Sequence, residues 1–275
     1  MTHFRSHRKI VVIDGQIGYI GGMNIGKQYM NYGKKKKPWR DTQVRVTGSG
    51  VLMLRYHFLK DWVCTISAKD FKKLGSSFYE EAVESPMQPF YLPNQIPCQF
   101  VVGGVDTPDE SIKICYLSLI RSAHHSIRIQ SPYFIPDPSI LDALKVAVAS
   151  GIDVEIMIPG ISASFFLTPV TRWFIGQLMS FGAKVYLYHG YMHAKTMIID
   201  EELVCIGSVN LDERSLRVDD EICGIFYDNA FTRQYDDIFS ADIFSSTPYT
   251  YEEFIKRSWF DKFQERIFLL FAPLM

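Results

Sequence analysis

Residues 193–200 read HAKTMIID, and residues 7–14 read HRKIVVID. Each stretch contains the pattern His-x-Lys-x4-Asp, and in each an asparagine follows ten residues after the Asp. If each residue type fills about one position in twenty, this pattern arises by chance about once in 160,000 positions. Two occurrences in 275 residues therefore indicate an internal duplication. The copies comprise His7, Lys9, Asp14 and Asn24, and His193, Lys195, Asp200 and Asn210.

The segments around both copies predict a β-hairpin followed by a turn of small residues. Residues 9–14 are typical of a buried strand, and Asp14-Gly15 is typical of the turn to a partner strand over 17–20. Residues 196–200 and 203–206 repeat this arrangement. The turns are Gly21-Gly22 in the first copy and Gly207-Ser208 in the second, with the asparagine close behind.

The remaining sequence predicts an α/β fold. Gly50–Ile66 has the apolar spacing of a helix. Further on, strands and helices alternate, which favours a mixed sheet covered by helices on both faces. The predicted strands lie over 98–102, 126–131, 152–158 and 184–188, and the predicted helices over 109–123, 138–149 and 170–181.

We expect two half-domains, each a mixed β-sheet flanked by helices and related by a pseudo-twofold axis. About ninety residues of strands and helices precede the second motif, whereas six residues precede the first, so internal symmetry predicts an incomplete first half. The strand over 9–14 should then have its hairpin partner over 17–20 but lack the neighbours that the missing part of the half would supply. The predicted divisions are 1–65 for the C-terminal part of the first half, 66–97 for a proline-containing linker, 98–245 for the second half and 246–275 for an amphipathic helix.

Composition narrows the function classes. A net charge of −1 argues against a global nucleic-acid-binding field. Five cysteines without a metal-ligand spacing favour a reducing, intracellular environment. No apolar run reaches the roughly 18 residues that a membrane-spanning helix needs.

The duplicated residue types suit a site for a tetrahedral oxyanion. Alternation along a strand places the His and Lys of each motif on one face, about 7 Å apart. Lysine supplies a positive charge and asparagine a directional donor, and Ser208 could add a hydrogen bond to phosphate. Two such half-sites, with His7 and His193 about 4–7 Å apart, could hold one phosphate between them.

This residue set predicts phosphoryl chemistry through a covalent phosphohistidine. One imidazole would attack phosphorus while the other protonates the leaving alkoxide. The lysines and asparagines would offset the charge on the phosphate oxygens, so no metal and no cofactor are expected. Each imidazole also needs an acceptor for its other ring nitrogen, and Asp41 and Glu221 are the candidates. Asp14 and Asp200 fall on the opposite strand face, which favours a structural role for both.

The double motif resembles that of the phospholipase D superfamily, over essentially the whole chain. Its flanking text is similar to that of bacterial cardiolipin synthases, in YIGGMN from 19, WRDT from 39, QSPYFIP from 130 and NLDERS from 210. The resemblance implies transfer of a phosphatidyl group from one phosphatidylglycerol to a second, with release of glycerol. It assigns catalytic roles to His7, Lys9, Asp14, His193, Lys195 and Asp200. Family members begin with membrane-spanning helices, so this chain resembles their C-terminal part.

The resemblance also implies partners and a location. We expect phosphatidylglycerol and an anionic membrane surface as partners, no nucleic acid, possible oligomers, and a peripheral position on the cytoplasmic membrane. Lys34–Lys37 is either a solvated loop or a contact for anionic headgroups. The terminal helix, with Trp259, Phe260, Phe263, Ile267, Leu270 and Phe271 on one face, either packs on the core or lies in the bilayer interface.

Two other function classes stay open. A phosphodiesterase of the same superfamily would act as a lipid hydrolase or a nuclease, although no basic, aromatic-interleaved groove favours the nuclease. A truncated, inactive fragment would serve only as an interaction or folding module.

Overall fold

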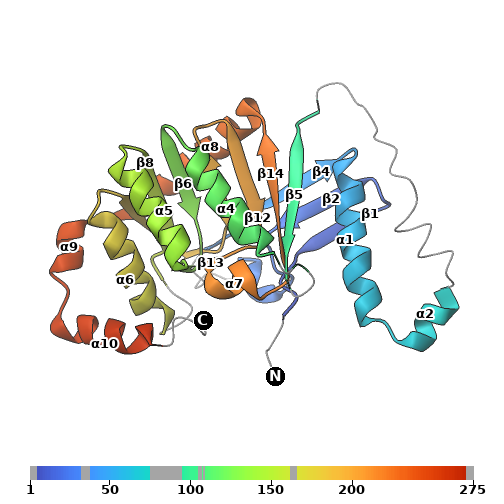
Figure 1. Ribbon diagram of the computed structural model, residues 1–275, viewed down its shortest axis with the longest axis horizontal. Helices are drawn as coiled ribbons and strands as arrows, with labels where there is room; N and C mark the ends of the chain where they lie inside the picture. The colour runs from blue at the N-terminus through green and yellow to red at the C-terminus, as the bar shows by residue number, and fades with distance from the viewer. Residues whose placement is uncertain are drawn as a thin grey trace.

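The computed structural model describes residues 5–31, 38–74, 95–104, 107, 109–161 and 166–270. The lysine run at 34–37 lies outside these residues. Within them, the second motif belongs to an eight-stranded mixed sheet (Figure 1) in which the neighbouring pairs β6–β8 and β8–β9 are parallel and the other neighbouring pairs are antiparallel. The spatial order is β15 (Ser246–Tyr249), β9 (Lys184–Tyr188), β8 (Asp153–Pro159), β6 (Ser126–Gln130), β11 (Thr196–Ile199), β12 (Leu203–Gly207), β14 (Glu221–Tyr227) and β5 (Cys98–Gly103).

The first motif belongs to a smaller antiparallel sheet with the order β1 (Ile10–Ile13), β2 (Ile17–Gly21) and β4 (Gln43–Thr47). Its hairpin has the same register as that of the second copy. Ile10 pairs with Ile20 in one, and the equivalent Thr196 pairs with Ile206 in the other. The third strands correspond as well, because β4 pairs with β2 as β14 pairs with β12. The duplication predicted from sequence is therefore confirmed in the strand pairing.

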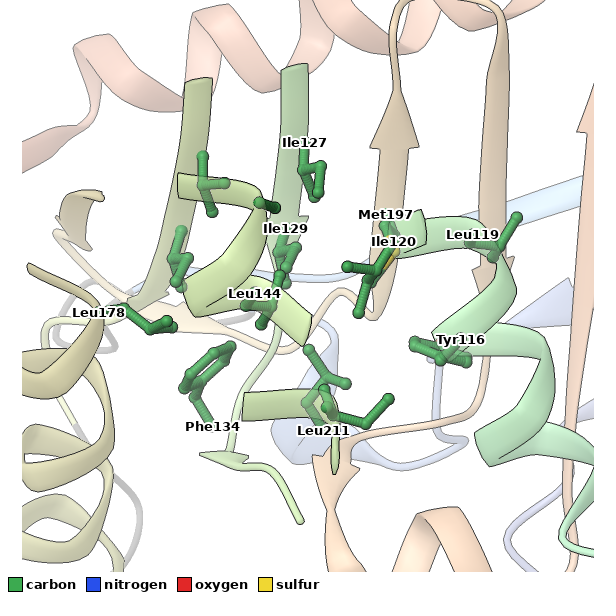
Figure 2. Close-up of a cluster of buried hydrophobic side chains, with 14 of the residues drawn as sticks. Tyr116, Leu119, Ile120, Ile127, Ile129, Phe134, Leu144, Leu178, Met197 and Leu211 are labelled. Carbon is green, nitrogen blue, oxygen red and sulfur yellow. The ribbon is translucent and has the colours of Figure 1, made fainter. Parts of the chain in front are cut away.

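Two hydrophobic cores lie on opposite faces of the large sheet. Helices α4 (Ser111–Ser122), α5 (Pro138–Ala149) and α6 (Leu167–Met179) cover one face and enclose the cluster in Figure 2. The small sheet, α1 (Gly50–Thr65) and α8 (Asn229–Phe244) contribute to the core on the other face. Strand alternation separates the two cores: on β12, Cys205 belongs to the first, and Val204 and Ile206 belong to the second.

The predicted helices are confirmed, with ends that follow local chemistry. Pro138 begins α5, and the Asp137 carboxylate accepts a hydrogen bond from the Ile140 backbone at 2.9 Å. Gly151 and Gly182, just after α5 and α6, take the positive φ that favours glycine there, at 88° and 114°.

Four short strands lie close to the motifs, together with a 3-10 helix and a short α-helix. They are β3 (Trp39–Arg40), β7 (Phe134–Ile135), β10 (Tyr191–Met192), β13 (Leu211–Asp212), the 3-10 helix η1 (Lys27–Tyr29) and α7 (Glu213–Arg217).

Two segments differ from expectation. The predicted linker holds a helix, α2 (Ala68–Leu74), and residues 75–94 lie outside the described part. The segment 246–275 is not one helix, because β15 first pairs with the edge strand β9. Thr250 and Ser258 then begin two separate helices through capping boxes, α9 (Tyr251–Ile255) and α10 (Trp259–Leu269). No helix in the described ranges is long and apolar enough to cross a bilayer.

Strand β1 is at the edge of its sheet among the described residues, whereas the equivalent β11 lies between β6 and β12. Ile10 and Val12 point into the second core, while Val11 and Ile13 are 42% and 44% exposed. An exposed apolar edge strand invites pairing with another chain.

Replacing both Val11 and Ile13 by threonine should therefore reduce self-association, because threonine keeps a high strand propensity without the apolar surface. Light scattering over a concentration series would measure this, and the free energy of unfolding should change by less than about 0.5 kcal/mol. Val12→Thr is the matched control, since it faces the core and should destabilise the fold. Unchanged association of the double variant would contradict the role of this edge.

Candidate active site

Two hydrogen bonds between imidazole and carboxylate cross from one half of the molecule to the other. His7 Nδ1 lies 2.8 Å from Oε1 of Glu221, which follows the second motif. His193 Nδ1 lies 2.7 Å from Oδ2 of Asp41, which follows the first motif. Each histidine is thus held by the carboxylate of the other half, and the two motifs share one site.

Backbone pairing between the halves produces this exchange. The segment before each histidine pairs in parallel with the segment before the opposite carboxylate, Ser6 with Asp220 and Met192 with Arg40. The histidine backbones complete the contact, His7 N donating to Asp220 O at 2.8 Å and His193 N to Arg40 O at 2.7 Å. Because the same pairing occurs twice, the pseudo-twofold relation extends into the site.

Both motif lysines are held beside their histidines. Lys9 Nζ donates to the His7 carbonyl at 2.7 Å, and Lys195 Nζ donates to the His193 carbonyl at 2.6 Å. Burial lowers the pKa of Lys9 to about 8, although the negative charges of Glu221 and Asp41 act in the opposite direction. Burial likewise lowers the pKa of Lys195, which is 1% exposed, to about 7. Burial also lowers the pKa of His193, although the hydrogen bond that the ring donates to Asp41 acts in the opposite direction.

The motif asparagines differ in burial. Asn24 is half-buried after β2. Asn210 is buried, lines a cavity together with His7, and its Oδ1 accepts no hydrogen bond from the residues that the structure describes. A side-chain amide can present its donors by rotating about its last bond, so Asn210 has a free polar group to offer a ligand.

Ser208 does not fill the role expected of it. The side chain is fully buried and its hydroxyl donates to Glu221, so its one proton is engaged. Its oxygen also accepts from the Ile222 backbone at 3.1 Å. Ser208 therefore holds the carboxylate that binds His7, rather than a phosphate.

The two motif aspartates lie away from the imidazoles, at the hairpin turns, where both have a positive φ. Asp200 accepts three backbone hydrogen bonds, from His124, His125 and Ser126, at 2.6 to 2.7 Å. Asp14 is exposed, and its carboxylate accepts no hydrogen bond from the described residues. The structure thus places Asp14 and Asp200 at the far ends of their strands, away from the imidazoles, and we predict a structural role for both.

Several residues near the site were missed at the level of sequence. Trp39 packs on His193 with ring centroids 4.9 Å apart, and Arg40 forms an ion pair with Asp242 of α8 at 3.0 Å. Asp212 is buried two residues after Asn210, and burial raises its pKa to about 6. The positions of Trp39 and Arg40 beside Asp41 were the available signal, whereas the burial of Asp212 has none in the sequence.

A cavity of about 690 Å³ opens beside His7. One part of its wall is polar, with Arg5, Asn210, Asp212, Arg214, Ser215 and Asp219, and the other is largely apolar, with Tyr133, Ile135, Phe166, Leu167 and Phe268. Within the described residues, no group of three or more His, Cys, Asp or Glu side chains is arranged to hold a metal ion.

The chain is similar in sequence to known cardiolipin synthases. Residues 116–243 match the family model described as cardiolipin synthase, PLD-like domain. Curated relatives include a cardiolipin synthase of Listeria monocytogenes and the major cardiolipin synthase of Bacillus subtilis, each 37% identical over 99% of this chain. The chain spans 55% of the length of each.

Among solved structures, the phosphatidylserine synthase of Haemophilus influenzae matches with a TM-score of 0.68. The match covers 98% of this chain and 69% of that one. At 15% sequence identity this likeness shows the fold alone.

Replacing Asp200 by alanine tests its structural role. The loss of three hydrogen bonds to a charged group should lower the free energy of unfolding by about 1–3 kcal/mol, while the folded variant keeps its turnover. Denaturant unfolding and an activity assay below the unfolding midpoint would measure both. Asp14→Ala is the control and should cost less stability. A folded Asp200→Ala variant without turnover would restore a catalytic role.

Proposed function

We propose that the chain is a phosphatidyltransferase of the phospholipase D superfamily that forms cardiolipin and glycerol from two molecules of phosphatidylglycerol. The observation that carries the proposal is the exchange of carboxylates, which assembles two imidazoles and two ammonium groups into one site. The names and identity of the curated relatives support the choice of substrate. We propose the surface of an anionic membrane as its place of action.

The carboxylates prepare the histidines for two different tasks. When Nδ1–H donates to Asp41 or Glu221, the Nε2 lone pair of that ring is free to act as nucleophile or base. In the first step, one Nε2 attacks phosphorus and the P–O bond to glycerol breaks. The other imidazole, protonated at Nε2, gives its proton to the departing alkoxide.

The second step reverses these roles. The imidazole that has lost its proton removes one from a hydroxyl of the second phosphatidylglycerol. The oxygen attacks phosphorus, the P–N bond breaks, and the first histidine is regenerated. Both carboxylates keep accepting the hydrogen bond from Nδ1–H and so hold the rings in place throughout.

The other site residues act on charge. Lys9 and Lys195, with Asn24 and Asn210, stabilise the phosphate oxygens as negative charge builds on them. Because both lysines are largely removed from water, each positive charge acts through a lower dielectric than it would at the surface. Ser208 contributes indirectly, through Glu221.

The product identifies the reaction. Incubating the protein with phosphatidylglycerol vesicles should yield cardiolipin and glycerol in equal amounts, measured by mass spectrometry and an enzymatic glycerol assay. Phosphatidic acid as the main product would contradict the proposed transfer and would indicate hydrolysis, with water as the acceptor. Absence of any product would leave the chain a binding or folding module.

Replacing His7 or His193 by alanine should abolish turnover, and replacing Lys9 or Lys195 by methionine should lower kcat by about 10²–10³. Acid-quench trapping with labelled substrate separates the histidines, because only loss of the nucleophile prevents phosphohistidine formation. EDTA is the matched control and should leave the rate unchanged, since the lysines offset the phosphate charge. Normal turnover by the double histidine variant would contradict the assignment.

The pH dependence follows from the lysines. Their ammonium forms are the stabilising ones, so kcat/KM should fall as the pH rises through their pKa values of about 7 and about 8. Replacing both by arginine, which stays protonated, should remove this alkaline decline even if the maximal rate is lower. A profile of the unaltered chain that is flat through this range would contradict the charge role of the lysines.

A further inference from the structure

Helix α10 exposes its main apolar face, and the side turned toward the protein carries Glu265 and Phe268. Five apolar side chains fall within an arc of about 100° on a helical projection. Trp259 and Leu270 are each 77% exposed, and Phe260, Phe263 and Ile267 also point outward. On the opposite side, Glu265 is buried and pairs with Arg257 at 2.7 Å. This orientation is the reverse of that of a helix packed on a hydrophobic core.

The same helix reaches the cavity beside His7. Phe268, on the inward side of α10, lines the cavity and meets the Phe166 ring edge-on, with centroids 5.2 Å apart. Leu167 at the start of α6 and Ile135 of β7 continue the apolar wall toward Asn210 and His7. Figure 1 shows α10 beside α6 at one end of the molecule. Helix α10 therefore carries the exposed apolar arc on its outer side and contributes Phe268 to the cavity wall on its inner side.

We propose that α10 docks on an anionic phospholipid bilayer, and that the cavity beside His7 receives an acyl chain of the lipid substrate. The proposal rests on the proposed function and adds the docking element and the chain-binding site. The arc would enter the acyl boundary, where tryptophan and phenylalanine are favoured. The cavity volume lies within the range of about 300–1,000 Å³ that is usual for ligand sites.

Charge favours a membrane over a second copy of the chain. Lys262 and Arg266 are exposed along one side of the arc, whereas the carboxylate of Glu265 is engaged on the inward side. Their long side chains can reach anionic headgroups while the arc inserts. A twofold interface through this face would instead bring the basic residues of two copies together.

Vesicle binding tests the docking helix independently of catalysis. The full chain would be sedimented with vesicles of phosphatidylglycerol and phosphatidylcholine, together with a variant carrying Trp259→Ser and Phe263→Ser. We expect the variant to lose at least tenfold in vesicle affinity with an unchanged melting temperature. Phe244→Ser is the matched control, since Phe244 is 90% exposed at the end of α8, and should bind like the unaltered chain.

Three outcomes would overturn the docking role: no binding by the unaltered chain, equal binding by the double variant, or a dimer in size-exclusion chromatography that the double variant abolishes. The last would assign the arc to a second copy. His193→Ala should bind vesicles normally, so failure of the catalytic proposal would not remove this readout.

Leu167→Trp tests the acyl-chain site. The larger side chain should narrow the cavity at a position distant from the imidazoles. We expect at least a tenfold lower kcat/KM on long-chain phosphatidylglycerol and little change on a short-chain, water-soluble analogue. Equal losses on both substrates, or no loss on either, would contradict the proposal that the cavity binds an acyl chain.

Discussion

Buried carboxylates require partners, and here the partners come from opposite halves of the molecule. The side chains of Glu221 and Asp41 are 0% and 5% exposed, and an isolated charge so far from water would be strongly destabilising. Each is stabilised by the histidine of the other motif. Neither half can therefore complete a site alone, and docking of the two halves and assembly of the chemistry are one event.

The same burial sets the electrostatics of the site. Removing Lys9 and Lys195 from water lowers their pKa values to about 8 and about 7, although two carboxylates oppose the shift. Both lysines therefore lose their protons at a lower pH than a lysine in water does. The phosphate diester of the proposed substrate would bring a negative charge that favours the protonated form of both lysines.

The halves are alike in hairpin register and in crossed pairing, yet their surroundings differ. The second motif lies inside a wide sheet with cores on both faces, whereas β1 has an exposed edge among the described residues. The cavity also lies beside His7. The two motifs are thus related by symmetry, but their surroundings are not. In the proposed mechanism, the two imidazoles would therefore contact different parts of the substrate.

The sequence by itself determined the duplication, the hairpins, the main helices and most of the reacting residue types, because these follow from local spacing and alternation. The odd spacing of Asp14 and Asp200 from their lysines also predicted that both lie on the strand face opposite the histidine and lysine. Only the tertiary structure decided which carboxylate holds which histidine, that Ser208 supports Glu221, and that α10 turns its apolar face outward. These features depend on contacts between segments that are far apart in the chain. Sequence periodicity predicts which residues share a face of a helix or strand, but not which other segment contacts that face.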